Sequence, residues 1–343
     1  MLGKFAPEEP LSAFADRLPL YQQIEAARGS KVLVYATSDR PGMEAQIAPD
    51  VIDFFVDHLD AMWPTQKISL ILHTNGGDTA AAWQLVNLFR TFCDDLEVII
   101  PRKALSSGTL ISLGANRIVM TKQASLGPID PSLNSALNPL IPGGGPNHRA
   151  PVSVEAVQGF LDVVQDQLKV TDAGALATVW NNLSEKIHPL VLGQIFRTRS
   201  QIRTLAKRLL AHQQVEEEKR DAIIAFLCSE SGSHDHTINR REARSMGLAI
   251  ENASEELYGI LKLLHNSMAD ALKSRTPFSP DTELAGQQQC GYSCSRVLIE
   301  SVSHGSHQFL SEGMISRVQM NQNGIPQVGI QDSRNFEGWR KVA

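Results

Sequence analysis

The 343-residue sequence has no excess of basic residues and few cysteines. Its 32 Lys and Arg residues do not outnumber its 37 Asp and Glu residues, and the net charge is −5. A chain with this charge balance lacks the excess of basic residues that nucleic-acid binding proteins carry, so we expect no nucleic-acid partner. The four cysteines, Cys93, Cys228, Cys290 and Cys294, are too few and too scattered for a disulfide framework. We therefore expect reduced thiols and a cytoplasmic location.

Membrane segments, export signals and cofactor motifs are also missing. The charge-free stretch from Pro131 to His148 holds four prolines, so we expect no integral membrane segment. Lys4 and Glu8 interrupt the region where a signal peptide is apolar. There is no Gly-x4-Gly-Lys-Ser/Thr pattern for ATP, and the C-x3-C at Cys290 has no second pair. We expect neither a metal nor another cofactor, and 42% hydrophobic residues suffice for a globular core.

Short apolar runs alternate with helical stretches from Lys31 to about Pro131. Strands are predicted over 32–35, 68–72, 98–100 and 118–120, and helices over 49–62, 78–92 and 108–114. Because these strands are continuously apolar, we expect helices to cover both faces of their sheet. The sequence therefore predicts an α/β fold with a largely parallel sheet.

The rest of the chain is predicted to be helical at first. Helices are expected over 152–168, 173–183, 188–212, 216–228 and 255–273, with a short strand and a helix near Arg240. Apolar residues from Leu190 to Leu210 form a stripe typical of a packing surface, within the chain or between subunits. Asn323-Gly324, between apolar runs at 314–318 and 328–330, predicts a hairpin. The last 70 residues have no functional interpretation.

Two glycine- or serine-containing turns follow neighbouring strands. His73-Thr74-Asn75-Gly76-Gly77 comes between a strand and a helix, where glycines let the backbone approach a ligand. Ser106-Ser107-Gly108 occupies the same place after the next strand. Each turn alone is typical of a tight connection or a helix cap. Ser106 follows Gly77 by 29 residues, one βαβ unit, so both turns should meet at one carboxyl edge of the sheet.

With these turns the sequence resembles the Clp protease and signal peptide peptidase superfamily, and within it the serine dehydrogenase proteinase family. The resemblance rests on 70–78, on 103–131 with its Ser125-Leu126-Gly127-Pro128 segment, and on 231–248. One difference is Asn75, where many relatives have proline. The resemblance implies a Clp/crotonase-like ββα superhelix with an added helical region. It divides the chain into an N-terminal extension over 1–30, a peptidase domain over 31–250, and a C-terminal helix and β-rich extension over 251–343.

The resemblance also implies roles for particular residues. Ser106 matches the nucleophile, and the N–H groups of Gly77 and Ser107 match the oxyanion hole. Ser107 is a rival nucleophile, but Ser106 places the Ser-x-Gly pattern among small residues. Asp235, seven residues before Glu242, matches the triad aspartate, although the His-Asp-His segment around it is also typical of an exposed turn.

The general base is not identified by the sequence. A serine hydroxyl needs a group that takes its proton, and no histidine occupies the Clp-type position in Gly127–Pro131. His188 and His234 are the first candidates, followed by Lys169 and Lys186. A base from a neighbouring subunit is a further alternative.

The favoured hypothesis is an ATP-independent serine endopeptidase that acts on polypeptides and forms a homo-oligomer. One alternative is a catalytically inactive Clp-like oligomeric scaffold, suggested by the missing base. The other is a crotonase-type acyl-CoA enzyme, which would use the same cradle for a thioester enolate.

Overall fold

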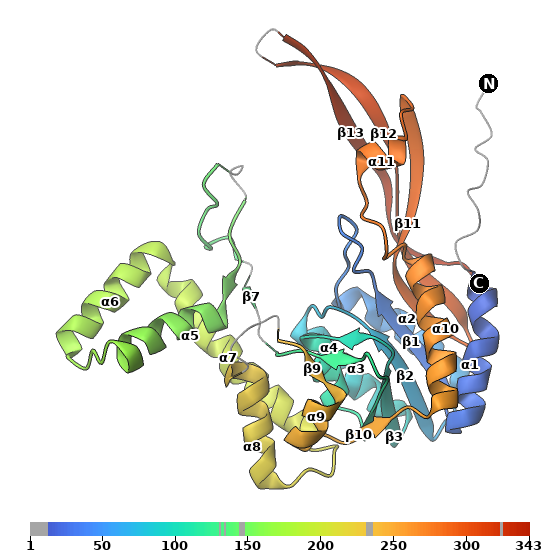
Figure 1. Cartoon of the computed structure of the whole chain (residues 1–343), viewed down its shortest axis with the longest axis horizontal. Coiled ribbons are helices and arrows are strands. Elements are labelled where there is room, and N and C mark those ends of the chain that lie inside the picture. The colour runs from blue at the N-terminus through green and yellow to red at the C-terminus, as the bar shows by residue number, and fades with distance from the viewer. Residues whose placement is uncertain (1–12, 130–131, 134, 144–147, 231–235, 323–324) are drawn as a thin grey trace. The chain divides into compact units, whose positions relative to one another are not determined.

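The structure is a computed structural model that describes residues 13–129, 132–133, 135–143, 148–230, 236–322 and 325–343 (Figure 1). The chain forms two compact units. The first takes its residues from Met1–Leu126, His212–Gln214 and Ile238–Ala343, and the second from Gly127–Ala211 and Val215–Thr237. The three domains expected from the sequence, with boundaries after residues 30 and 250, stay a proposal.

The first unit is built on an eight-stranded sheet in the order β10-β5-β3-β2-β1-β11-β12-β13. Its first five strands are β10 (Ile250–Asn252), β5 (Arg117–Met120), β3 (Asp95–Ile100), β2 (Lys67–His73) and β1 (Lys31–Thr37). These five run parallel to one another. All four strands predicted from continuous apolar runs are therefore present, and the predicted α/β class with its largely parallel sheet is confirmed.

Helices cover both faces of the parallel strands. Successive side chains of a strand point to opposite faces, so a continuously apolar strand needs cover on both sides. On one face, Val32 and Val34 of β1 pack in a cluster with α1 (Phe14–Arg28) and α10 (Glu255–Ala271), which run side by side in Figure 1. On the other face, the ring of Tyr35 contacts Phe55 of α2 (Ile52–Met62), which contacts Phe89 of α3 (Thr79–Phe92). The short helix η1 (Pro49–Val51) leads into α2.

The C-terminal region extends the same sheet. β11 (Gln289–Ser301), β12 (Gly305–Gln322) and β13 (Ile325–Lys341) are antiparallel, and β11 pairs with β1. The predicted hairpin is confirmed by the pairing of Gln322 with Ile325, while its turn at 323–324 lies outside the described residues. The helix α11 (Pro280–Leu284) precedes β11. The segment for which the sequence offered no functional interpretation thus supplies three strands of the main sheet.

A buried ion pair joins the two ends of the chain. Glu300 of β11 accepts hydrogen bonds from the guanidinium of Arg17, from the hydroxyl of Tyr21 and from Ser306. The Arg17 and Glu300 side chains are both fully buried. Because buried charges need such partners, this contact fixes α1 on the C-terminal strands.

Smaller elements of the first unit carry the turns singled out in the sequence. A three-stranded sheet contains β4 (Lys103–Ala104), β6 (Ser125–Leu126) and β9 (Ile238–Asn239). The helix α4 (Ser107–Leu113) follows β4, and α9 (Arg240–Met246) follows β9. The strand and helix expected near Arg240 are therefore present.

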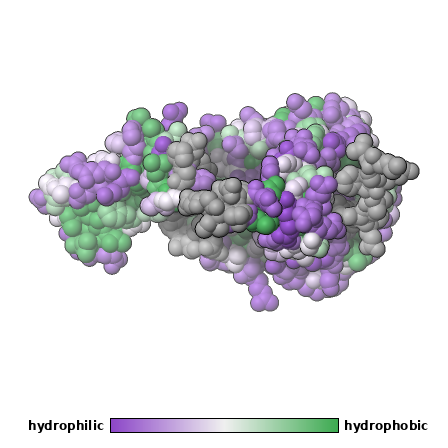
Figure 2. Space-filling model, turned by 90° about the horizontal axis from the view of Figure 1, so that it is seen from above, coloured by the Kyte–Doolittle hydropathy of each residue, from purple (hydrophilic) through white to green (hydrophobic). Residues whose placement is uncertain are grey.

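The second unit is mostly helical. It contains β7 (Ser132–Leu133), β8 (Val152–Ser153), α5 (Val154–Asp162), η2 (Val163–Gln167), α6 (Ala173–Lys186), α7 (Pro189–Leu210), α8 (Glu217–Ala225) and η3 (Phe226–Glu230). The predicted stripe on α7 packs within the chain, since Val191, Leu192 and Ile195 lie in a buried cluster with α5. Other apolar side chains stay exposed: Phe160, Val163, Leu168, Trp180, Leu190 and Phe196. Figure 2 shows apolar surface gathered over part of the second unit.

Among the described residues, no helix has both the length and the apolar character needed to cross a membrane.

Candidate active site

Ser106 has an unusual backbone conformation at the junction of β4 and α4. Its φ is 50° and its ψ is −114°, a combination that costs a non-glycine residue free energy. Its side chain accepts no hydrogen bond from the start of α4, so it does not act as an ordinary helix cap. The residue is half-buried. A strained strand-to-helix turn that leaves a hydroxyl partly accessible is the arrangement in which hydrolases present a nucleophilic serine.

The diglycine turn lies directly against Ser106. A Cβ atom placed on Gly76 would lie 2.7 Å from the Cβ of Ser106, and one on Gly77 would lie 2.3 Å from the carbonyl oxygen of Ile47. Ile47 holds this turn as a short parallel bridge: its N–H donates to Gly76 and its carbonyl accepts from Asp78. Only glycine fits at both positions, because a side chain would collide with backbone or with Ser106. The two turns predicted to meet at one sheet edge are therefore in contact.

Thr74 and Gly108 fix the distance between the two turns. The N–H of Thr74 donates to the carbonyl of Lys103 at 3.1 Å, and the N–H of Leu105 donates to the carbonyl of Thr74 at 3.0 Å. A Cβ on Gly108 would lie 2.5 Å from the Cγ2 of Thr74, so the glycine of the Ser-x-Gly pattern allows this close packing. Asp78 then caps α3 by accepting from the N–H of Ala81 at 2.7 Å.

Ser107, the rival nucleophile, is engaged elsewhere. Its side chain is fully buried, and its hydroxyl donates to the carbonyl of Gly77 at 2.5 Å. That bond ties the start of α4 to the diglycine turn. Within the described ranges, neither the N–H of Gly77 nor that of Ser107 donates to another residue. Neither N–H group is therefore engaged within the part of the chain that the structure describes, and their role as an oxyanion hole stays a prediction.

The candidate bases are not brought into this site by the described contacts. His188 belongs to the second unit, where its Nδ1 accepts from the N–H of Leu190 at 3.2 Å at the start of α7. Lys169 and Lys186 belong to the same unit. His234 and Asp235 lie outside the described residues. The roles assigned to these five residues stay predictions.

A polar cavity of about 320 Å³ adjoins the strand that leads to Ser106. It is lined by residues that include Asp39, His73, Lys103, His265 and Arg275. Lys103 pairs with Asp39 at 2.7 Å, and His73 lies 3.6 Å from the same carboxylate oxygen. Burial alone would raise the pKa of Asp39, but these two partners hold it well below its usual range. Burial also lowers the pKa of His265 to about 4, helped by the nearby His73.

This cavity was missed in the sequence. The signal available was the position of His73, where the strand before the first turn ends, and of Lys103, three residues before Ser106. Asp39 and His265 come from distant segments and carry no motif.

Comparison with known proteins supports the motif-based interpretation. Residues 59–141, which include both turns, match the model of the ClpP-like SDH-type serine proteinases. The predicted family resemblance is confirmed. Two uncharacterized proteins of Methanocaldococcus jannaschii are similar: MJ0137 is 30% identical over 201 residues, 58% of each chain, and MJ1495 is 42% identical over 66 residues, 19% of this chain and 23% of that one. The chain thus spans less than two thirds of the length of these curated relatives.

Two solved structures are also similar to the chain. A mutant of the 1510-N membrane-bound stomatin-specific protease has 17% identity and a TM-score of 0.37, with 63% of this chain and 79% of that chain covered. ClpP1 from Listeria monocytogenes has 14% identity and a TM-score of 0.37, with 69% and 99% covered.

Proposed function

We propose that this protein is an ATP-independent serine endopeptidase with Ser106 as its nucleophile. The Ser106 hydroxyl oxygen attacks a peptide carbonyl, and a base takes the hydroxyl proton. The N–H groups of Gly77 and Ser107 stabilise the negative oxygen of the tetrahedral intermediate. The base then gives its proton to the leaving amine, and water hydrolyses the acyl-enzyme in a second round of the same steps.

One observation carries this proposal: Ser106 holds a strained φ of 50° against the diglycine turn without capping its helix. A serine with a purely structural role would have no reason to keep such a conformation, since glycine adopts it freely. The family match over 59–141 supports the same reaction class.

The test is labelling of the folded full-length chain with a fluorophosphonate probe. We expect labelling of the wild type, loss in Ser106→Ala, and retention in the matched neighbour Ser107→Ala, whose hydroxyl is buried and bonded to Gly77. Labelling that survives in Ser106→Ala and disappears in Ser107→Ala would overturn the assignment. No labelling at all would favour the inactive scaffold or the acyl-CoA enzyme, which a thermal shift with an acyl-CoA would then distinguish.

The base is tested in the same assay. A general base contributes about 10²–10⁴-fold to rate, so the variant that removes it should lose that much labelling rate. We propose His188 first and His234 second, with Lys169 and Lys186 as further candidates and Asp235 as the residue that orients the base. Equal rates in all these single variants would point to a base from another subunit.

We also propose that the protein is a cytoplasmic homo-oligomer that acts on polypeptides. The exposed apolar residues of the second unit support self-association, because contiguous apolar surface is a common sign of an interface. Trp180 on α6 and Phe196 on α7 contact each other and are both exposed. Sedimentation of the wild type beside Trp180→Ser tests this, and an unchanged monomer in both would contradict it.

A further inference from the structure

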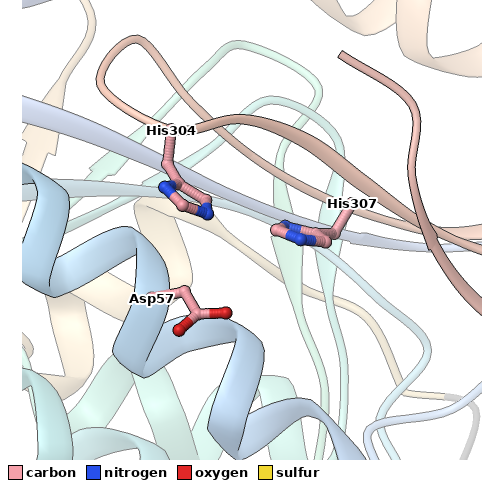
Figure 3. A group of neighbouring side chains, drawn as sticks. All are labelled: Asp57, His304 and His307. Atoms are coloured by element: carbon pink, nitrogen blue, oxygen red, sulfur yellow. The ribbon is translucent and has the colours of Figure 1, made fainter.

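Three side chains of the first unit that could bind a metal ion lie close together. Asp57 comes from α2, His304 from the turn between β11 and β12, and His307 from β12. Figure 3 shows the three side chains, with Asp57 on its helix and the two imidazole rings beside it. One ligand atom from each residue lies within 4.8 Å of the other two. Asp57 is exposed, His304 is half-buried and His307 is 6% exposed.

The donor set and its spacing suit a small divalent transition-metal ion. Zn²⁺ binds imidazole nitrogens and carboxylate oxygens at roughly 2.0–2.2 Å, so tetrahedral ligand atoms lie about 3.3 Å apart. The three ligand atoms, which lie within 4.8 Å of one another, therefore need to close by up to about 1.5 Å around an ion. Two nitrogen donors favour Zn²⁺, Co²⁺ or Ni²⁺ over Mg²⁺ and Ca²⁺, which prefer oxygen.

A hydrogen-bond chain behind His307 orients its ring. The Nδ1 of His307 lies 3.1 Å from the Nε2 of His58, and the Nδ1 of His58 lies 2.7 Å from the Oγ of Ser301. His58 is fully buried. If each Nδ1–H donates along this chain, His307 keeps a free lone pair on Nε2. An outer partner that holds a ligand's other nitrogen is the usual support of a metal-binding histidine.

Lys341 occupies one nitrogen of the group. Its Nζ lies 3.2 Å from the Nε2 of His304. A metal ion repels this ammonium, so binding through that nitrogen requires the lysine side chain to turn away. Lys341 is the last residue of β13 and is exposed, so its side chain can turn away at little cost in free energy.

We propose that Asp57, His304 and His307 form a binding site for a divalent transition-metal ion that joins α2 to the C-terminal strands. This proposal departs from the expectation of a chain without a metal, which rested on the C-x3-C at Cys290 having no second pair. Asp57 is far from His304 and His307 along the chain, so no single stretch of sequence contains all three ligands. The site is independent of the proposed peptidase reaction.

The experiment is isothermal titration of chelator-treated, full-length protein with Zn²⁺, with Co²⁺ absorbance as a probe of the ligand geometry. We expect one ion per chain, a tetrahedral Co²⁺ spectrum, and at least tenfold weaker binding in Asp57→Asn and in His304→Ala. Because Asp57 is exposed, Asp57→Asn keeps the test valid if the histidine variant fails to fold. The matched control His212→Ala removes an exposed histidine elsewhere in the first unit and should bind as the wild type does.

Lys341→Ala provides a test in the opposite direction. Removal of the competing ammonium should tighten Zn²⁺ binding severalfold. The proposal is overturned if Asp57→Asn and His304→Ala bind Zn²⁺ like the wild type, if Lys341→Ala weakens binding, or if Ca²⁺ binds as tightly as Zn²⁺.

Discussion

Replacement of Ser106 by glycine should make the protein more stable while abolishing its proposed activity. The φ of 50° and ψ of −114° at Ser106 cost a residue with a Cβ roughly 1–3 kcal/mol. Glycine avoids this cost, but its greater freedom in the unfolded chain costs about 0.5–1 kcal/mol. The net expectation is a gain of about 1 kcal/mol for Ser106→Gly relative to Ser106→Ala, which keeps the Cβ and therefore the strain.

The assay is urea unfolding of both variants under identical conditions, with two matched alanine-to-glycine controls. Ala177→Gly lies at an exposed position inside α6 and should destabilise by about 1 kcal/mol, the ordinary cost of glycine in a helix. Ala285→Gly lies at a left-handed position with φ 45° and should be neutral or stabilising. If Ser106→Gly is less stable than Ser106→Ala by about 1 kcal/mol, like the helix control, the strain argument and the observation behind the proposed nucleophile are both wrong.

Two further predictions concern the frame around the site. Arg17→Met should lower the free energy of unfolding by about 3–5 kcal/mol, because it leaves the buried Glu300 carboxylate without its cation. Adding Glu300→Gln to this variant should restore part of the loss. If the unfolding free energy of Arg17→Met in urea lies within about 0.5 kcal/mol of the wild type, the prediction is wrong. Stability should also fall as pH drops from about 6.5 to about 4, since the pKa of His265 is lowered to about 4 when folded while the unfolded chain takes up the proton near 6.5. His265→Leu should flatten the melting temperature over that pH range, and an unchanged slope would show that His265 is not the group involved.

The parallel part of the fold could be predicted because its signals are local. Continuous apolar runs such as 68–72 identify doubly covered strands, and glycines at 76–77 and 108 mark turns where only glycine fits. The contact between the diglycine turn and Ser106 followed from the 29-residue separation and the geometry of one βαβ unit.

The rest could not be predicted because it depends on pairing between distant segments. No motif in the sequence of β11 indicates that it pairs with β1. The pairing of two strands so far apart along the chain depends on the fold of the segments between them. The same holds for the cavity, whose Asp39 and His265 meet across the fold, and for the histidines at 304 and 307. The stripe on α7 was correctly predicted as packing surface, but sequence alone did not show that it faces its own chain.

Arg17 and Glu300 are 283 positions apart, so their ion pair cannot form until long after α1 has been synthesised. At roughly 5–20 residues per second, α1 emerges about 15–60 s before its acidic partner is made. Within that interval, Val32 and Val34 of β1 lack part of their cover until α10 has been made. The turn region around Ser106 is synthesised well within the interval. The ion pair that fixes α1 on the C-terminal strands can therefore form only after Glu300 of β11 has been made.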